Sequence, residues 1–336
     1  MINHPAVSVI MPVYNGATYL TEAIQSILQQ TFDNFEFIII DDGSEDRSVD
    51  IIKAFQKSDK RVILKDNEEN RGIVYSLNYG ISIARGKYVA RMDCDDISNH
   101  RRLENQVGFL ERNPEIGVVG SKAYIIDEKG QIYAQIDVPE RHFEIFWNLF
   151  FQNPILHPSV MLRMDILQDI SIYDECMSFS QDYELWTRLI ERVSFHNIQK
   201  PLLYYRIHNF NVTNKHRNTQ LENSIKINHS FVARTLQKKI PLNVIRVLRS
   251  NGTCSQQELF SAFKVIRELA RIVSNKSALT RTEQKQLNQF VSMRIFKTAK
   301  LRMQYPAAWL GFLLAFFYSP RAVINRTRKF LENGPK

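Results

Sequence analysis

The first hundred residues alternate between short, continuous apolar runs and segments in which apolar positions recur at every third or fourth residue. The segments have the period of amphipathic helices. The runs have the length of strands that are buried on both faces of a sheet, and they are VSVIMPV (7–13), FEFIII (35–40), RVILKDN (61–67) and KYVARM (87–92). Strands and helices that alternate over short connections predict an α/β fold with a mostly parallel, doubly wound sheet.

The pattern is less regular beyond residue 100. We expect helices mixed with short strands there, the strands lying at 117–120, at 123–133 on either side of a turn at residues 128–130, at 157–163 and at 201–208. From about residue 216 the apolar positions have helical spacing alone. We therefore predict an α/β domain over residues 1–215, in two halves divided at residue 100, and a helical C-terminal region over residues 216–336.

The net charge of +9 comes entirely from the last part of the chain. Residues 281–336 contain eleven Lys and Arg against two acids, and the preceding residues are neutral in sum. The same segment contains AAWLGFLLAFFY (307–318), which carries no charge. As a helix this run would be about 18 Å long, whereas a hydrocarbon core is about 30 Å thick, so it is too short to cross a membrane.

A basic segment with an apolar centre is typical of helices that lie in an anionic membrane surface, and we favour that reading for residues 281–336. The alternatives are a helix that packs on the main domain with a solvated basic face, or an interface between copies of the chain. We do not expect nucleic acid as a partner, because no recognisable nucleic-acid-binding module accompanies the charge.

The three cysteines are widely spaced and fit neither a disulfide framework nor a zinc site. The first residues lack a basic segment followed by an apolar stretch of signal-peptide length. We therefore expect a cytoplasmic protein, held at the inner face of the cytoplasmic membrane by its basic segment.

Polar residues follow each of the four predicted strands at its carboxyl end. They are Asn15 and Gly16, Asp41 and Asp42, residues 67–71, and the group Asp93, Asp95 and Asp96. The carboxyl ends of parallel strands meet at one edge of a sheet, and ligands of such sheets bind there. The four groups therefore predict a single binding site.

Asp93, Asp95 and Asp96 place three carboxylates within four positions. Like charges so close disfavour each other's ionised form, unless a divalent cation among them reverses the balance. Mg²⁺ and Mn²⁺ prefer one or two carboxylates together with substrate phosphates. The cluster thus predicts a metal-bridged nucleoside diphosphate, and a polar turn in which Asp96 or Ser98 caps the next helix is the alternative.

Five stretches of the chain, in this order, resemble the family 2 glycosyltransferases of the GT-A fold, which include bacterial polysaccharide and lipopolysaccharide sugar transferases. They are VSVIMPVYNGATYLTEAIQSILQQT, FEFIIIDDGSEDRS, NRGIVYSLNYGISIARGKYVARMDCDD, HPSVMLR and SQDYELWTRL, and they cover roughly residues 6–208. The resemblance implies that residues 1–100 bind a nucleotide-sugar and that residues 101–215 face the acceptor. Beyond about residue 216 no motif of the family is present.

The resemblance also implies residues that contact the donor nucleotide. They are Pro12, Tyr14 and Asn15 in the first loop, Asp41 as the acceptor of a hydrogen bond from a uracil ring, Arg71, Asn78, and Asp93 near the ribose. Asp41 makes UDP the expected nucleotide in preference to GDP or dTDP.

The metal ligands implied by the resemblance are Asp95, with Asp93 and His208 beside it, for Mn²⁺ or Mg²⁺. His208 ends an apolar strand, and a hydrogen-bonded structural histidine is the alternative at that position. Asp182 resembles the catalytic base, although Gln181 stands where members often have a second acid. A carboxylate at the start of a helix is also what a helix cap looks like.

The function that these residues predict is inverting transfer of a sugar from a nucleotide-sugar to a hydroxyl of a saccharide or lipid-linked oligosaccharide. A non-catalytic nucleotide-sugar-binding scaffold on the same fold is the alternative. A phosphoryl-accepting receiver domain also gathers aspartates at strand ends, but its acidic pair would follow the first strand and its chain would be far shorter. The sugar and the acceptor cannot be read from the sequence.

Overall fold

The computed structural model describes residues 4–167, 172–208, 216–249 and 253–325. It divides into two compact units: unit 1 lies within residues 1–145 and 153–223, and unit 2 within residues 146–152 and 224–336.

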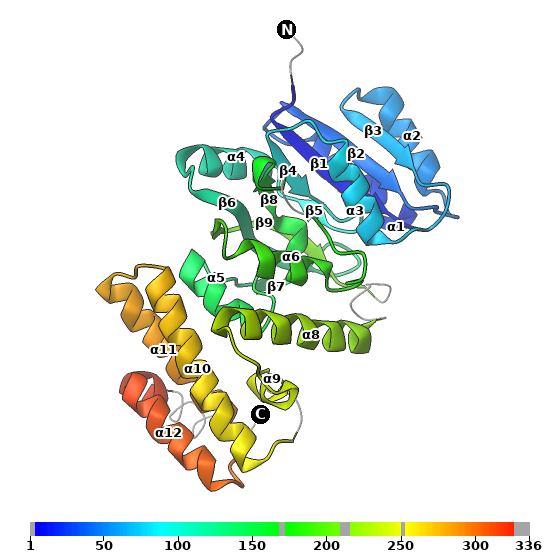
Figure 1. Cartoon of the computed structure of the whole chain (residues 1–336). Helices are drawn as coiled ribbons and strands as arrows, with labels where there is room; N and C mark the ends of the chain where they lie inside the picture. The colour runs from blue at the N-terminus through cyan, green and yellow to red at the C-terminus, as the bar shows by residue number, and fades with distance from the viewer. Residues whose placement is uncertain (1–3, 168–171, 209–215, 250–252, 326–336) are drawn as a thin grey trace. The chain divides into compact units, whose positions relative to one another are not determined.

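Within the described residues, unit 1 is built on a nine-stranded sheet of order β3-β2-β1-β4-β8-β6-β9-β5, with β7 paired to β6. The strands β1 (Val7–Val13), β2 (Phe35–Asp41), β3 (Val62–Asp66) and β4 (Tyr88–Arg91) run parallel to one another. Every residue of β1 and β2 is buried, as expected for strands covered on both faces. The predicted α/β fold is confirmed (Figure 1).

The helices α1 (Ala17–Leu28), α2 (Ser48–Ser58) and α3 (Ile73–Ser82) connect the four parallel strands. The register places Val13 of β1 opposite Asp41 of β2, and Asp41 opposite Asp66 of β3. The three strands therefore end at the same level, which brings the loops after them to one edge of the sheet.

The second half of unit 1 differs in detail from the sequence expectation. Instead of one short strand at 117–120 and another between residue 123 and the expected turn at 128–130, a single strand, β6 (Ile116–Ile126), runs through both. It pairs in parallel with the long strand β9 (Ser194–Arg206). The turn falls at residues 127–131, where Asp127 accepts hydrogen bonds from three backbone N–H groups, and β7 (Ile132–Ile136) follows. Pairing with a distant strand has extended β6 beyond what its own pattern predicts.

The expected strand at 157–163 begins as a 3₁₀ turn, η1 (His157–Ser159), and only Met161–Arg163 forms strand β8. Pro158 cannot donate to a ladder, and Ser159 N–H bonds back to the carbonyl of Leu156 at 2.9 Å. The remaining elements of unit 1 are β5 (Ile97–Ser98), α4 (Arg102–Arg112), η2 (Asp165–Leu167) and α6 (Gln181–Leu189), while α5 (His142–Leu149) starts in unit 1 and ends in unit 2.

The described part of unit 2 contains helices and no strands, which confirms the predicted helical C-terminal region. These helices are the greater part of α8 (Arg217–Leu236), then α9 (Leu242–Leu248), α10 (Gln256–Lys276), α11 (Arg281–Lys300) and α12 (Pro306–Tyr318). Reciprocal capping boxes start two of these helices, Ser255 with Glu258 at α10 and Thr280 with Glu283 at α11. Within the described ranges, no helix is long and apolar enough to cross a membrane.

Candidate functional site

A cavity of about 800 Å³ opens at the carboxyl ends of the parallel strands in unit 1. Its walls come from the loop after β1, the loop before α3, the end of β4 with the loop that follows, and the segments around Phe179 and His208. This volume is within the range of cavities that hold small ligands. The four polar strand ends predicted from the sequence therefore do meet around one space.

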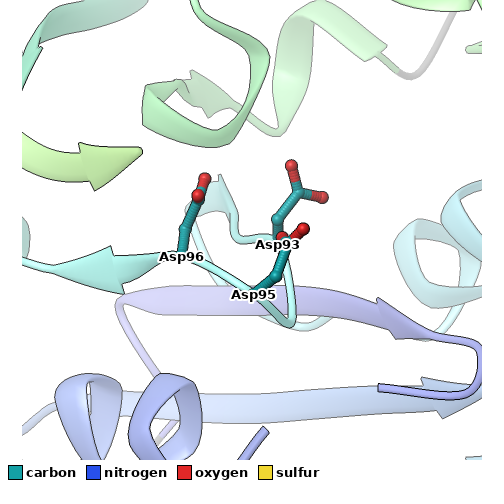
Figure 2. Close-up of side chains that lie close together, drawn as sticks. All are labelled: Asp93, Asp95 and Asp96. Carbon is teal, nitrogen blue, oxygen red and sulfur yellow. The ribbon is translucent and has the colours of Figure 1, made fainter. Parts of the chain in front are cut away.

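The loop between β4 and β5 carries the three carboxylates Asp93, Asp95 and Asp96 (Figure 2). One oxygen of each lies within 4.8 Å of the others. Asp93 forms an ion pair with Arg91, and Asp96 Oδ1 accepts a hydrogen bond from the backbone N–H of Arg206 at 2.9 Å. The loop thus directs the acidic groups toward one point.

Burial and the closeness of the carboxylates make negative charge unfavourable in this cluster. Burial raises the pKa of Asp93 to about 6, although the guanidinium of Arg91 acts in the opposite direction. Burial, with Asp95 and Asp93 nearby, raises the pKa of Asp96 well above its usual range. Asp96 Oδ2 is buried and has no hydrogen-bond partner in the described part of the chain. A buried oxygen without a partner among clustered carboxylates fits a site for a divalent cation.

His208 lies beside this cluster, as its expected metal-binding role requires. Its Nε2 is 2.9 Å from Asp95 Oδ2, and its ring lies 5.1 Å from that of Tyr19 between centroids. The contact with Asp95 allows two roles: a ligand that binds metal beside the carboxylate, or a hydrogen-bonding partner that orients it.

Pro12, Tyr14 and Asn15 all line the cavity. Asn15 has a φ of 51°, and its loop is fastened on both sides: its N–H donates to Ser44 Oγ, and its Oδ1 accepts from Glu45 N–H, each at 2.9 Å. Asparagine tolerates this left-handed conformation better than most residues do. The first loop is therefore held in a defined shape at the cavity wall.

Asp41 and Asp42 separate into two environments. Asp41 is buried, with Oδ2 accepting from Ser44 N–H at 2.8 Å, while its Oδ1 has no partner among the described residues. Asp42 accepts four hydrogen bonds that fix the loop before α3, from the side chains of Asn67 and Ser76 and the backbone N–H groups of Arg71 and Gly72. Asp42 therefore organises the loop, whereas Asp41 retains an acceptor atom.

Arg71 and Asn78 are not among the residues that line the cavity, and neither are Asp41, Asp96 and Asp182. The guanidinium of Arg71 lies over the ring of Tyr75, 3.5 Å from its centroid. The amide of Asn78 bonds both backbone groups of Tyr173, donating to its carbonyl at 2.9 Å and accepting from its N–H at 3.0 Å. Their nucleotide contacts stay a prediction.

Asp182 is the second residue of α6, and the N-cap is Ser180. Its Oδ2 accepts from Asn153 Nδ2 at 2.6 Å, and its Oδ1 accepts from Tyr183 N–H at 2.7 Å. Burial raises the pKa of Asp182, and its charge in turn contributes to the raised pKa of Asp93. A desolvated carboxylate close to the acidic cluster has the properties of a general base.

Arg91 is a cavity residue that the sequence reasoning missed. It ends β4, is 5% exposed, and pairs with Asp93, while its Nε and Nη1 have no partner in the described part of the chain. The signal that could have revealed it is the arginine inside the apolar run YVARM, because a strand buried on both faces admits a charge only beside a counter-charge.

Phe179 and His216 were also missed, and both line the cavity. Their rings stack at 4.0 Å with an angle of 11° between planes. Phe179 has a φ of 66°, a strained value for a bulky side chain. Neither the strain nor the pairing leaves a signal in the sequence pattern, and His216 lies beyond the last recognised motif.

Comparisons with known proteins point to one family. Residues 8–171 match the family model described as Glycosyl transferase family 2. An uncharacterized glycosyltransferase of Methanocaldococcus jannaschii is 41% identical over 212 residues, which is 62% of this chain and 73% of that protein.

Two similar solved structures share the fold. Residues 1–349 of TarS from S. aureus, in complex with UDP-GlcNAc, superpose with a TM-score of 0.56 at 18% identity, covering 96% of this chain and 91% of that one. The mannosyltransferase PcManGT from Pyrobaculum calidifontis, in complex with GDP-Man and Mn²⁺, gives 0.52 at 15% identity, covering 99% and 88%.

One conclusion follows from the parallel strands, from the acidic loop after β4 and from the match of residues 8–171 to the family model. The chain belongs to glycosyl transferase family 2 and is a glycosyltransferase of the GT-A type.

Proposed function

We propose that this glycosyltransferase moves a sugar from a nucleotide-sugar to a hydroxyl of a saccharide or lipid-linked acceptor, with inversion at the anomeric carbon. The observation that carries the proposal is the acidic cluster Asp93, Asp95 and Asp96, of which Asp93 and Asp95 line a cavity large enough for a nucleotide-sugar. Residues 1–100 would form the donor half, 101–215 the acceptor half, and 216–336 the helical extension.

Asp95 would be the principal ligand of Mn²⁺ or Mg²⁺, with Asp93 and His208 beside it. When bound, such an ion neutralises the charge that develops on a departing nucleoside diphosphate. Support comes from the partnerless Oδ2 of Asp96, which shows that the cluster is incomplete in hydrogen bonds. PcManGT, which has this fold, was solved with Mn²⁺.

The nucleotide would lie along the first loop, against Pro12, Tyr14 and Asn15, with Asp41 accepting a hydrogen bond from the base. The partnerless Oδ1 of Asp41 supports this, because a ring N–H is the kind of donor that such an atom lacks. UDP is the preferred nucleotide, as the resemblance at Asp41 implies. Of the two structures that share the fold, TarS was solved with UDP-GlcNAc and PcManGT with GDP-Man.

Asp182 would remove the proton from the acceptor hydroxyl while that oxygen attacks the anomeric carbon. Its raised pKa makes it a better proton acceptor than an exposed aspartate, and Asn153 and the backbone of Tyr183 hold both of its oxygens in place. Alignment of donor and acceptor in one cavity would supply much of the remaining acceleration.

The acceptor would be part of a cell-surface polysaccharide or lipopolysaccharide, built at the inner face of the cytoplasmic membrane. The alternative, a scaffold that holds a nucleotide-sugar without turnover, would not need a desolvated carboxylate beside the donor. Asp182 therefore favours the enzyme over the scaffold.

The test is thermal stabilisation of the purified protein by UDP, GDP and dTDP, each with and without Mn²⁺. We expect a rise in melting temperature with UDP that requires both Mn²⁺ and Asp95. Asp95→Ala should abolish it, and Asp50→Ala, which removes an exposed carboxylate of α2, should not. No shift with any nucleotide in folded protein would remove the support for a donor site.

A further inference from the structure

Helix α12 reverses the usual placement of large and small side chains. Its buried residues are the small ones, Ala307, Ala308, Gly311 and Ala315. Its large residues face water: Trp309 is 62% exposed, Leu313 69% and Phe317 82%, with Leu310 and Phe316 also exposed. The exposed positions follow a helical period, so they form one continuous face. We call these five residues the outer face of α12.

The packing of α12 against its neighbours holds this orientation. The helix runs along α10 and α11 (Figure 1). A Cβ at Gly311 would lie 2.4 Å from Phe263 Cζ and 2.9 Å from Ala299 Cβ, so only glycine allows this approach. The Ser292 hydroxyl of α11 donates to the carbonyl of Ala315 at 2.8 Å. Rotation that buried the outer face would break both contacts.

We propose that the outer face of α12 inserts into the surface of an anionic lipid bilayer, with the helix lying in the plane of the membrane. A continuous apolar face on a protein surface marks an interaction site. At 13 residues, α12 is about 20 Å long, too short to span a bilayer but suited to lying in its interface. Trp309 and Tyr318 are the aromatic types enriched at that depth.

Charge complementarity selects anionic lipid over a second copy of the chain. Lys297 and Lys300 precede the helix and Arg321 follows it, while α12 itself carries no charge. The basic residues Arg326, Arg328 and Lys329 of the same segment lie outside the described residues. Within residues 281–325 seven Lys and Arg stand against a single acid, Glu283, so two copies of this segment would repel each other, whereas an anionic surface attracts it.

Vesicle binding by the full chain tests this surface without any donor or acceptor, so its failure would leave the proposed sugar transfer untouched. The probe is sedimentation with vesicles of phosphatidylglycerol and phosphatidylethanolamine, compared with phosphatidylcholine alone. We expect binding to the anionic vesicles that weakens with salt, and much less binding to phosphatidylcholine.

Trp309 supplies an internal reporter of insertion. The other two tryptophans, Trp147 and Trp186, are buried. A shift of emission to shorter wavelength with anionic vesicles, and quenching by lipids brominated at shallow depth, would therefore report on the outer face. No spectral change despite binding would overturn insertion.

The paired variant Leu313→Glu with Phe317→Glu should lower partitioning into anionic vesicles by about tenfold or more, since each apolar side chain loses its favourable transfer. Phe260→Glu on α10 is the matched control, at 41% exposure, and should bind as the wild type does. Equal binding by the paired variant would overturn the proposal. So would a wild-type dimer in solution that this variant dissociates, with no binding to vesicles.

Discussion

Two regions of the molecule place side chains against their chemical preference, in opposite senses. Around the cavity of unit 1, Asp41 and Asp96 are buried with oxygens that lack partners in the described part of the chain. On α12 of unit 2, Trp309 and Phe317 face water. Each arrangement costs free energy in the isolated chain, because carboxylates prefer water and large apolar groups avoid it. A partner of matching chemistry would offset each cost.

The two regions differ in how strictly they specify that partner. The carboxylates act through hydrogen bonds and charge at set distances, so exchange of one oxygen changes the chemistry. The outer face of α12 acts through apolar area, which has no preferred direction. We therefore expect even an isosteric exchange of one of the carboxylates to lower the activity of the cavity. An exchange of one apolar residue for another on the outer face of α12 should leave the function of that face intact.

The largest expected effect is on Asp182. Asp182→Asn should lower kcat about 10³-fold, because the amide cannot accept the proton from the acceptor hydroxyl. UDP-dependent thermal stabilisation should be unchanged, which separates catalysis from folding. The measurement is the initial rate of nucleotide release on a water-soluble acceptor.

The paired variant Leu313→Glu with Phe317→Glu serves as the reverse control, since it should keep the wild-type kcat on that acceptor. Turnover by Asp182→Asn equal to that of the wild type would favour the scaffold alternative.

The next effect concerns the inner side of α12. Gly311→Leu should lower the free energy of unfolding by about 2 kcal/mol, since a side chain there overlaps Phe263 and Ala299. Phe317→Leu, on the outer face, should change it by less than about 0.5 kcal/mol. Urea denaturation measures both. Similar losses for the two variants would mean that the outer face is also packed.

Asn153 provides a smaller and more specific test. Asp182 has a raised pKa, so kcat should fall as the pH drops through that pKa, because the protonated acid is not a base. Asn153→Ala removes a hydrogen bond that favours the charged form, and should move this acidic limb upward by about one pH unit. The measurement is kcat against pH from 5 to 9, and a downward shift would contradict the assignment.

The smallest expected effect is on the stability of the protein without metal, through Asp96 of the acidic cluster. Because the pKa of Asp96 is raised in the folded state, its contribution to stability is present at low pH and is lost as the pH rises through the folded value. At pH 7 without metal, the substitution Asp96→Asn should therefore raise the free energy of unfolding by about 1 kcal/mol. Melting in the presence of a chelator, with and without added Mn²⁺, tests this. A variant less stable than the wild type under chelation would show that charge repulsion is not the controlling factor.

Much of unit 1 could be predicted from local pattern. The apolar runs that form β1, β2 and β4 are buried throughout, as their composition predicts, whereas in β3 only Val62 is buried. Parallel strands necessarily bring the residues that follow them to one edge of the sheet. For this reason the sequence pattern alone predicts that Asn15, Asp93 and Asp95 are neighbours, and all three line the cavity. The extent of β6 was not predictable, because it depends on a parallel partner some eighty residues further along the chain.

By itself, the sequence determined the order of strands and helices, the polar edge of the sheet, and the basic, apolar composition of the C-terminal segment. The tertiary structure alone decided that Arg91 would neutralise Asp93 from inside a strand, and that Phe179 would stack on His216. It also decided which face of α12 would be covered, since alanines and a glycine fit against α10 and α11 where larger residues cannot. The periodicity of a sequence predicts which positions face the interior. The residues they contact there belong to segments distant in the chain, and periodicity does not specify them.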